Sequence, residues 1–209
     1  MEMTIKKTVL AAMLGALSVS AVAEVPAYAA EKPKRFYVEA GLNRGSGETE
    51  FDGDGTITSK MDTSMSTLTF GYIAKTGVRF ELALVSIDAS FDAGDPSFDE
   101  DGDSEFSGFD LNGKLPLSKG KVRPYLGAGM GFYDWKDTGD LFVDGEDLSG
   151  VSLNLMAGVL VEPHPHVEVE LGAQHKTIFW QTVQFVGSST EIETSSSFLG
   201  LQAGVKVKF

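Results

Sequence analysis

The sequence contains no cysteine among its 209 residues, and this absence removes several kinds of chemistry at once. Disulfides, thiolate metal sites, cysteine nucleophiles and a lipoprotein anchor are all excluded. Basic residues are also scarce, because 17 lysines and arginines face 30 aspartates and glutamates, which gives a formal net charge of -13. Nucleic-acid binding requires a basic face, so we expect no nucleic-acid partner.

Long apolar runs are confined to the N-terminus, where residues 1–23 have the parts of a secretory signal peptide. Lys6 and Lys7 form the positive region, residues 8–23 form the apolar region, and Ala21–Ala23 is an A-x-A cleavage site. The sequence therefore predicts export of the chain from the cytoplasm.

The rest of the chain is expected to consist of a short segment followed by one domain. A second candidate cleavage site at 27–29 gives the signal an alternative end near residue 29. We expect residues 24–34 to form a short periplasmic segment and residues 35–209 to form one domain. That domain lacks the roughly 20 consecutive apolar residues that a spanning helix needs.

After the signal, apolar and polar residues alternate with a period of two, which is the pattern of a β-strand with two different faces. In residues 199–209 the odd positions are Leu, Leu, Ala, Val, Val and Phe, whereas the even positions are Gly, Gln, Gly, Lys and Lys. The same alternation recurs seven more times, at 36–43, 68–74, 78–84, 109–115, 122–132, 151–159 and 167–174.

The connections between these eight segments alternate between short and long. The short ones are 75–77, 118–121 and 163–166. The long ones are rich in aspartate and glutamate and cover 45–64, 91–106, 134–150 and 178–195. Short periplasmic turns and long outer loops are typical of outer-membrane barrels. The sequence thus predicts an all-β, eight-stranded, antiparallel up-and-down transmembrane barrel with long acidic extracellular loops.

The polar face contains many glycines, and this decides which face points inward. Exposed glycine would weaken the strands of a soluble barrel, whereas inside a narrow barrel it leaves room for long side chains from neighbouring strands. We therefore expect the apolar face to meet lipid. Aromatic residues near the strand ends, including Trp135 and Trp180, are expected to form girdles at the membrane interfaces.

Two segments carry a resemblance to a known family. Residues 121–133 read KVRPYLGAGMGFY, and the chain ends with alternating apolar residues and a phenylalanine. The sequence resembles, over about residues 35–209, the small outer-membrane barrels that include the OmpX and opacity-type surface proteins and the membrane domain of OmpA. The resemblance implies a place in the outer membrane of a Gram-negative bacterium, in contact with outer-membrane lipid and lipopolysaccharide. It also implies recognition by the barrel-assembly machinery through Val205, Val207 and Phe209.

Charged residues on the predicted inward face form the first candidate site. The interior of an eight-stranded barrel is just wide enough to be filled by side chains, and charges buried there must pair. We expect a structural ion-pair plug; the alternative, suggested by the OmpA membrane domain, is a gate whose pairs exchange partners. Arg79, Lys114, Arg123, Glu168 and Lys208 are predicted near the periplasmic end, with Glu39, Glu81, Glu170 and Lys206 further in.

The acidic residues Glu50, Asp52 and Asp54 form the second candidate site. Their spacing, with glycine at the sixth position, resembles the first half of an EF-hand loop. The twelfth position is Met61, where a bidentate glutamate would be required. Two interpretations remain: a weak divalent-cation site that helps to bridge lipopolysaccharide phosphates, or a solvated run of charge.

The three histidines give little support to catalysis. His175 is followed by Lys176 and Thr177, unlike the His-x-Ser arrangement of outer-membrane lipid A deacylases. His164 and His166 lie in a proline-containing turn. No nucleophile is visibly oriented toward a base, as acyl transfer requires. We therefore expect neither an enzyme nor a cofactor.

Three hypotheses for function remain. The first is a structural or surface-interaction role carried by the acidic extracellular loops, with an unknown extracellular partner. The second is a narrow channel for small ions or small apolar molecules, and the inward glycines at 127, 129 and 131 leave some space in the lumen. The third is a lipid A-modifying enzyme.

Overall fold

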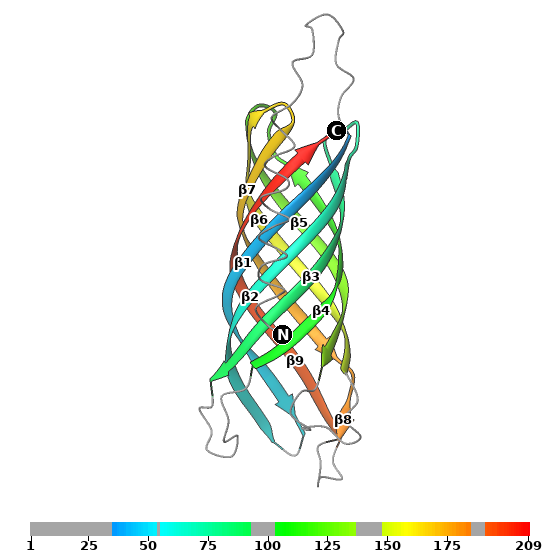
Figure 1. The fold of residues 1–209 in the computed structure, drawn as a ribbon. Coiled ribbons are helices and arrows are strands. Elements are labelled where there is room, and N and C mark those ends of the chain that lie inside the picture. Colours follow the sequence, from blue (N-terminus) through cyan, green and yellow to red (C-terminus); the bar gives the residue numbers. More distant parts are fainter. Residues whose placement is uncertain (1–34, 54, 93–102, 137–147, 185–190) are drawn as a thin grey trace, which may run out of the picture.

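The structure, a computed structural model, describes residues 35–53, 55–92, 103–136, 148–184 and 191–209. Within them the chain forms one closed antiparallel barrel (Figure 1), in which neighbouring strands pair in sequence order and β1 pairs with β9. The strands are β1 (Phe36–Asp52), β2 (Thr56–Ile73), β3 (Arg79–Asp92), β4 (Asp103–Pro116), β5 (Val122–Lys136), β6 (Leu148–His164), β7 (Val167–Trp180), β8 (Val183–Gln184) and β9 (Glu191–Lys208). The two-residue β8 pairs only with β9, so eight strands build the barrel wall.

The described part of the chain contains no helix that is long and apolar enough to span a membrane.

The two faces of each strand differ as the alternation predicts. Leucine and phenylalanine side chains cover the outside: Leu201 is 75% exposed and Leu155 is 64% exposed. Charged and polar side chains such as Glu168 and Lys206 point inward and are fully buried. The predicted eight-stranded barrel with an outward apolar face is therefore confirmed.

The strands are longer than the sequence pattern indicates. Residues 45–64, predicted as a loop, belong almost entirely to β1 and β2, which pair continuously from Phe36 with Tyr72 to Asp52 with Thr56. In this stretch both faces carry mainly polar residues, so hydropathy no longer alternates although the ladder of backbone hydrogen bonds continues. The prediction of a loop here is wrong for that reason.

One end of the barrel carries three short connections, and it lies at the top of Figure 1. Two of these turns contain a glycine with positive φ, Gly77 at 91° and Gly120 at 130°, a conformation that other residues rarely adopt. The third joins β6 to β7 directly after His164. The predicted short turns are confirmed.

The lumen toward the opposite end is filled by apolar side chains. Phe106, Trp135 and Trp180 contact one another at ring-centroid distances of 5.0–5.4 Å, and Phe91 stacks on Trp135 at 5.9 Å. Trp135 and Trp180 are 3% and 6% exposed. The expectation that these two tryptophans form a membrane girdle is therefore wrong, because each occupies an inward position of its strand.

Candidate functional site

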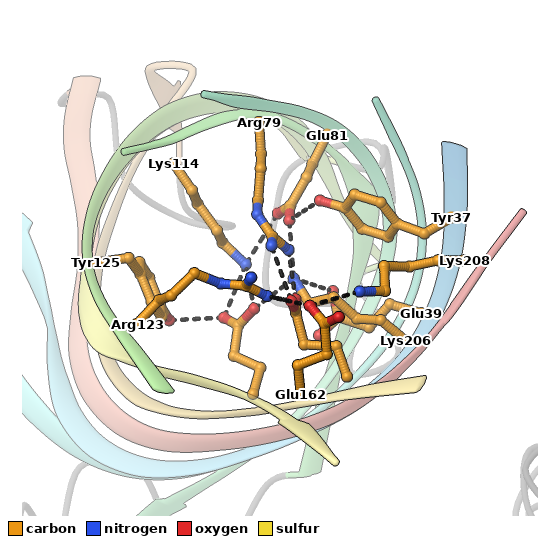
Figure 2. A network of polar contacts seen from close by, with 12 residues as sticks. Tyr37, Glu39, Arg79, Glu81, Lys114, Arg123, Tyr125, Glu162, Lys206 and Lys208 are labelled. Carbon is orange, nitrogen blue, oxygen red and sulfur yellow. Dashed lines mark hydrogen bonds and ion pairs between the residues drawn. The ribbon is translucent and has the colours of Figure 1, made fainter. Parts of the chain in front are cut away.

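The lumen near the short-turn end holds a dense set of charged side chains, here called the lumen charge network (Figure 2). Each member occupies an inward position of its strand, so the period-two alternation alone brings together residues far apart in sequence. The network consists of Glu39, Arg79, Glu81, Lys114, Arg123, Glu162, Glu168, Glu170, Lys206 and Lys208.

An outer tier of the network lies at the short-turn end. Arg79 binds Glu168 through both terminal nitrogens, with the Nη2 to Oε2 distance at 2.8 Å. Arg123 also binds Glu168, and it binds Glu162 at 2.8 Å. Lys208 donates to the same Glu162 at 2.7 Å. Bidentate guanidinium–carboxylate contacts are both strong and directional, so this tier is tightly held.

An inner tier follows one step further into the barrel. The ammonium group of Lys206 lies 2.5 Å from Glu170 and 3.1 Å from both Glu39 and Glu81. Lys114 lies 2.7 Å from Glu170 and 2.9 Å from Glu81. All five side chains are at least nine-tenths buried, so each charge depends on its partners rather than on water.

Two tyrosines complete the inner tier. Tyr37 donates a hydrogen bond to Glu81, and Tyr125 donates one to Glu170 at 2.6 Å. The ring of Tyr37 also lies 4.9 Å from the ammonium of Lys206, within the range of a cation–π contact. Gly71 makes room for Tyr37, because a Cβ atom there would lie 2.0 Å from its ring.

The network contains as many carboxylates as cations. Glu39, Glu81, Glu162, Glu168 and Glu170 are matched by Arg79, Lys114, Arg123, Lys206 and Lys208. Oxygens of Glu39, Glu81 and Glu170 lie within 4.8 Å of one another, as metal ligands would. Lys206 contacts all three, so an ammonium group already supplies the positive charge that a metal ion would bring.

On the side of the inner tier that faces away from the short turns, the lumen is narrow. A cavity of about 40 Å³, lined by residues that include Asn112, Gln174 and Gln202, has room for only a few water molecules. The glycines at 129 and 131 do not widen it, because side-chain oxygens of Asn112 and Asp110 occupy the adjoining space.

A separate ion pair marks the boundary with the apolar half. Lys176 lies 2.7 Å from Asp110, and Tyr133 donates to the same carboxylate at 2.8 Å. The Lys176 ammonium also lies 4.3 Å from the centroid of the Tyr133 ring. Beyond this pair, toward the opposite end, the buried side chains are chiefly apolar.

The structure brings all nine predicted network residues together. The backbone of Lys114 pairs with that of Arg79 near the short-turn end, where both residues were predicted. The long side chain of Lys114, however, carries its ammonium group to the inner tier. Sequence reasoning missed Glu162, Asp110 and Lys176. All three occupy inward positions, so a strict reading of the alternation could have found them.

The comparisons with known proteins agree with the barrel fold. Residues 9–209 match the model of a family described as outer membrane protein beta-barrel domain. The chain belongs to the outer-membrane β-barrel family. Its place is therefore the outer membrane of a Gram-negative bacterium, as predicted. Barrels of this kind have their short turns on the periplasmic side, and the two ends of the barrel are named accordingly.

Several solved structures of outer-membrane barrels are similar to the chain. The outer membrane protein OprG from Pseudomonas aeruginosa is 15% identical, with a TM-score of 0.54, over 86% of this chain and 97% of that one. Neisserial surface protein A is 18% identical, with a TM-score of 0.48, over 83% of this chain and 97% of that one. Ail, the attachment invasion locus protein of Yersinia pestis, is 18% identical, with a TM-score of 0.32, over 78% and 97%. No curated protein matches the chain.

The second candidate site lies at the extracellular end. Glu50 and Asp52 are exposed on the outer face of β1, within the strand rather than in a loop, and Asp52 accepts a hydrogen bond from Thr56 at 3.1 Å. Asp54 lies outside the described residues. Cation binding by these residues stays a prediction.

His175 has a neighbour that the sequence did not reveal. Its Nε2 lies 3.2 Å from the Oγ of Ser197, on the outer face of the barrel. The structure therefore brings a hydroxyl within hydrogen-bond distance of an imidazole. Among the described residues, however, His175 has no hydrogen-bonded carboxylate to orient its ring.

The C-terminal residue closes the barrel wall. The Phe209 amide donates to the Phe36 carbonyl at 2.9 Å, and the Phe209 side chain is 65% exposed toward lipid. Val205 and Val207 lie on the same outward face. Recognition of these residues by the barrel-assembly machinery stays a prediction, and the predicted signal peptide lies outside the described residues.

Proposed function

We propose that the protein is a closed, non-enzymatic outer-membrane barrel that acts through its acidic extracellular end. One observation carries this proposal: the described lumen is closed by ion pairs in the periplasmic half and by packed aromatic rings in the extracellular half, with a cavity of only about 40 Å³ beside the inner tier. A closed lumen leaves the outer surfaces as the places where the protein meets other molecules.

The charge of the extracellular end supports a surface role. On the outward faces of the strands that extend past the apolar band, acidic side chains outnumber basic ones. The acids are Glu48, Glu50, Asp52, Asp62, Asp88, Glu105, Asp134 and Glu193, and the bases are Arg44, Lys60 and Lys136. Further acids of the predicted loops, Asp95, Asp99, Glu100, Asp101, Asp137, Asp140, Asp144, Glu146 and Asp147, lie outside the described residues.

Such a surface suits two related roles. Carboxylates attract cationic partners, and together with divalent cations they can bridge to the phosphates of lipopolysaccharide. Either role stabilises or connects the cell envelope without any reaction. A channel for small ions or small apolar molecules is the alternative, and it would need a continuous path past the lumen charge network.

The test is complementation of a deletion strain with a charge-neutralised protein. The variant combines Glu48→Gln, Glu50→Gln, Asp52→Asn and Asp62→Asn, all at exposed positions. The matched control changes neighbouring exposed hydroxyls on the same strands, Ser46→Ala and Thr58→Ala, and keeps the charge.

Two readouts follow, attachment of cells to a polycation-coated surface and exclusion of an apolar dye after mild chelation. We expect the control to restore both and the neutralised variant to fail in at least one, at equal protein level in the outer membrane. Full restoration of both readouts by the neutralised variant would show that these extracellular acids are not required for the function.

A further inference from the structure

The periplasmic mouth of the barrel is a vestibule of about 560 Å³. Its walls come from the β2–β3 turn, the β4–β5 turn and Pro165, and its floor comes from the outer tier of the lumen charge network. This volume lies within the range of sites that bind small molecules. It is separate from the extracellular surface that carries the proposed function.

Cations dominate the lining of the vestibule. Lys75, Arg79, Lys119, Arg123 and Lys208 all line it, whereas Glu162 is the one carboxylate among the described lining residues. This composition is opposite to the net charge of the chain, which is -13. A concave site of one sign with low-dielectric walls concentrates ions of the opposite sign.

The excess of positive charge is not neutralised by the protein itself. The network is balanced without Lys75 and Lys119, which are exposed and, among the described residues, have no carboxylate within ion-pair distance. Both lysines stand on the short turns that border the vestibule, one on either side of Arg79 in sequence.

The floor of the vestibule adds positive charge that is fixed in place. The Nε atoms of Arg79 and Arg123 are buried and have no acceptor among the described residues. The Arg79 side chain is 97% buried, its terminal nitrogens are held by Glu168, and it is therefore fixed in place. Guanidinium groups present N–H donors in a planar fork that suits phosphate and carboxylate oxygens.

We propose that this vestibule binds an oxyanion, a phosphate or a carboxylate group, carried by a soluble periplasmic molecule. Lys75 and Lys119 attract the anion, and the guanidinium groups of Arg79 and Arg123 add fixed positive charge at the floor. Inward-facing Arg79, Arg123 and Lys208 line the vestibule, so a soluble anion reaches it more directly than a lipid headgroup in the surrounding leaflet.

The experiment measures anion binding to the refolded barrel in maltoside micelles, which contain no phosphate. Inorganic pyrophosphate and citrate are titrated separately by calorimetry at low ionic strength, because salt screens exposed charges. Amide chemical shifts from NMR locate the site through Gly77 and Gly120, one in each bordering turn. The two anions distinguish a phosphate site from a carboxylate site.

The variant Lys75→Gln/Lys119→Gln should weaken binding about tenfold, since two exposed charges are lost. Lys121→Gln removes a positive charge from the same end of the barrel at a residue that does not line the vestibule, and it should leave the affinity unchanged. The proposal is supported if the wild type shows chemical-shift changes at Gly77 and Gly120, the double variant binds more weakly, and Lys121→Gln binds as the wild type does. Absence of binding by both anions, or equal weakening per charge by Lys121→Gln, would overturn it.

Discussion

The two halves of the lumen are closed by different kinds of interaction. In the periplasmic half, charges from seven of the eight wall strands form a balanced network in which most groups have several partners. In the extracellular half, aromatic and aliphatic side chains fill the same cross-section by contact. The barrel wall is continuous through both halves, so the difference lies in the inward residues alone.

This difference predicts how each half should respond to substitution. A buried ion network loses stability when one member is removed, because the remaining charges stay buried without compensation. A packed apolar half responds instead to lost volume, through the cavity that remains. Substitutions in the two halves should therefore differ in whether a second substitution can repair them.

The largest effect is expected for Glu170→Gln in the periplasmic half. Glu170 contacts both Lys114 and Lys206, so the substitution leaves two buried ammonium groups facing fewer carboxylates. We expect the free energy of unfolding to fall by about 4 kcal/mol, measured by urea titration of the barrel in phospholipid vesicles. Glu50→Gln, at an exposed position, serves as the control and should stay within about 0.5 kcal/mol of the wild type. Equal effects of the two substitutions would mean that the network contributes no specific stability.

In the extracellular half, Trp135→Ala should lower the free energy of unfolding by about 3 kcal/mol. The ring packs against Phe91, Phe106 and Trp180, and its removal leaves a cavity lined by apolar side chains. Trp135→Phe keeps most of the volume and should cost less than half as much in the same titration. If both substitutions cost the same, packing would not be what closes this half.

The boundary pair offers a direct test of repair. Lys176→Met alone leaves the Asp110 carboxylate buried without its cation, although Tyr133 still donates to it. Adding Asp110→Asn removes the unpaired charge, so the double variant should recover stability. A double-mutant cycle of unfolding free energies should give a coupling of about 2 kcal/mol. Additive losses would show that the two residues act independently.

The smallest effect concerns the glycine beside Tyr37. A Cβ atom at position 71 would lie 2.0 Å from the Tyr37 ring, so Gly71→Ala must displace that ring from Glu81. We expect a loss of about 1.5 kcal/mol. Gly113→Ala, whose Cβ would meet only a backbone oxygen at 3.8 Å, should not destabilise the barrel. A comparable loss at both glycines, measured by the same urea titration, would point to backbone effects alone.

The sequence predicted the periplasmic half better than the extracellular half. Lys206 and Lys208 stand at even positions between lipid-facing Val205, Val207 and Phe209, so their inward direction follows from the alternation. Which carboxylate each lysine contacts could not follow, because that depends on the lateral arrangement of strands and on side-chain reach. Lys114 illustrates this, since its backbone lies beside Arg79 and its ammonium lies in the inner tier.

The extracellular half was harder to predict for a different physical reason. Trp135 and Trp180 lie near strand ends, where membrane girdles are expected, and only the parity of their positions indicates that they point inward. Above the membrane the strands no longer alternate between lipid and lumen, so the pairing of β1 with β2 through Asp52 and Thr56 leaves no hydropathy signal.

The most direct test of a lumen closed in both halves is the conductance of the refolded protein in a planar bilayer, with insertion verified by heat-modifiable gel mobility. The wild type should give a silent bilayer, and Glu170→Ala and Arg123→Ala should be silent too, because the aromatic half still blocks the path. Discrete openings of the wild type, altered by either substitution, would contradict the closed lumen and make the charge network a gate.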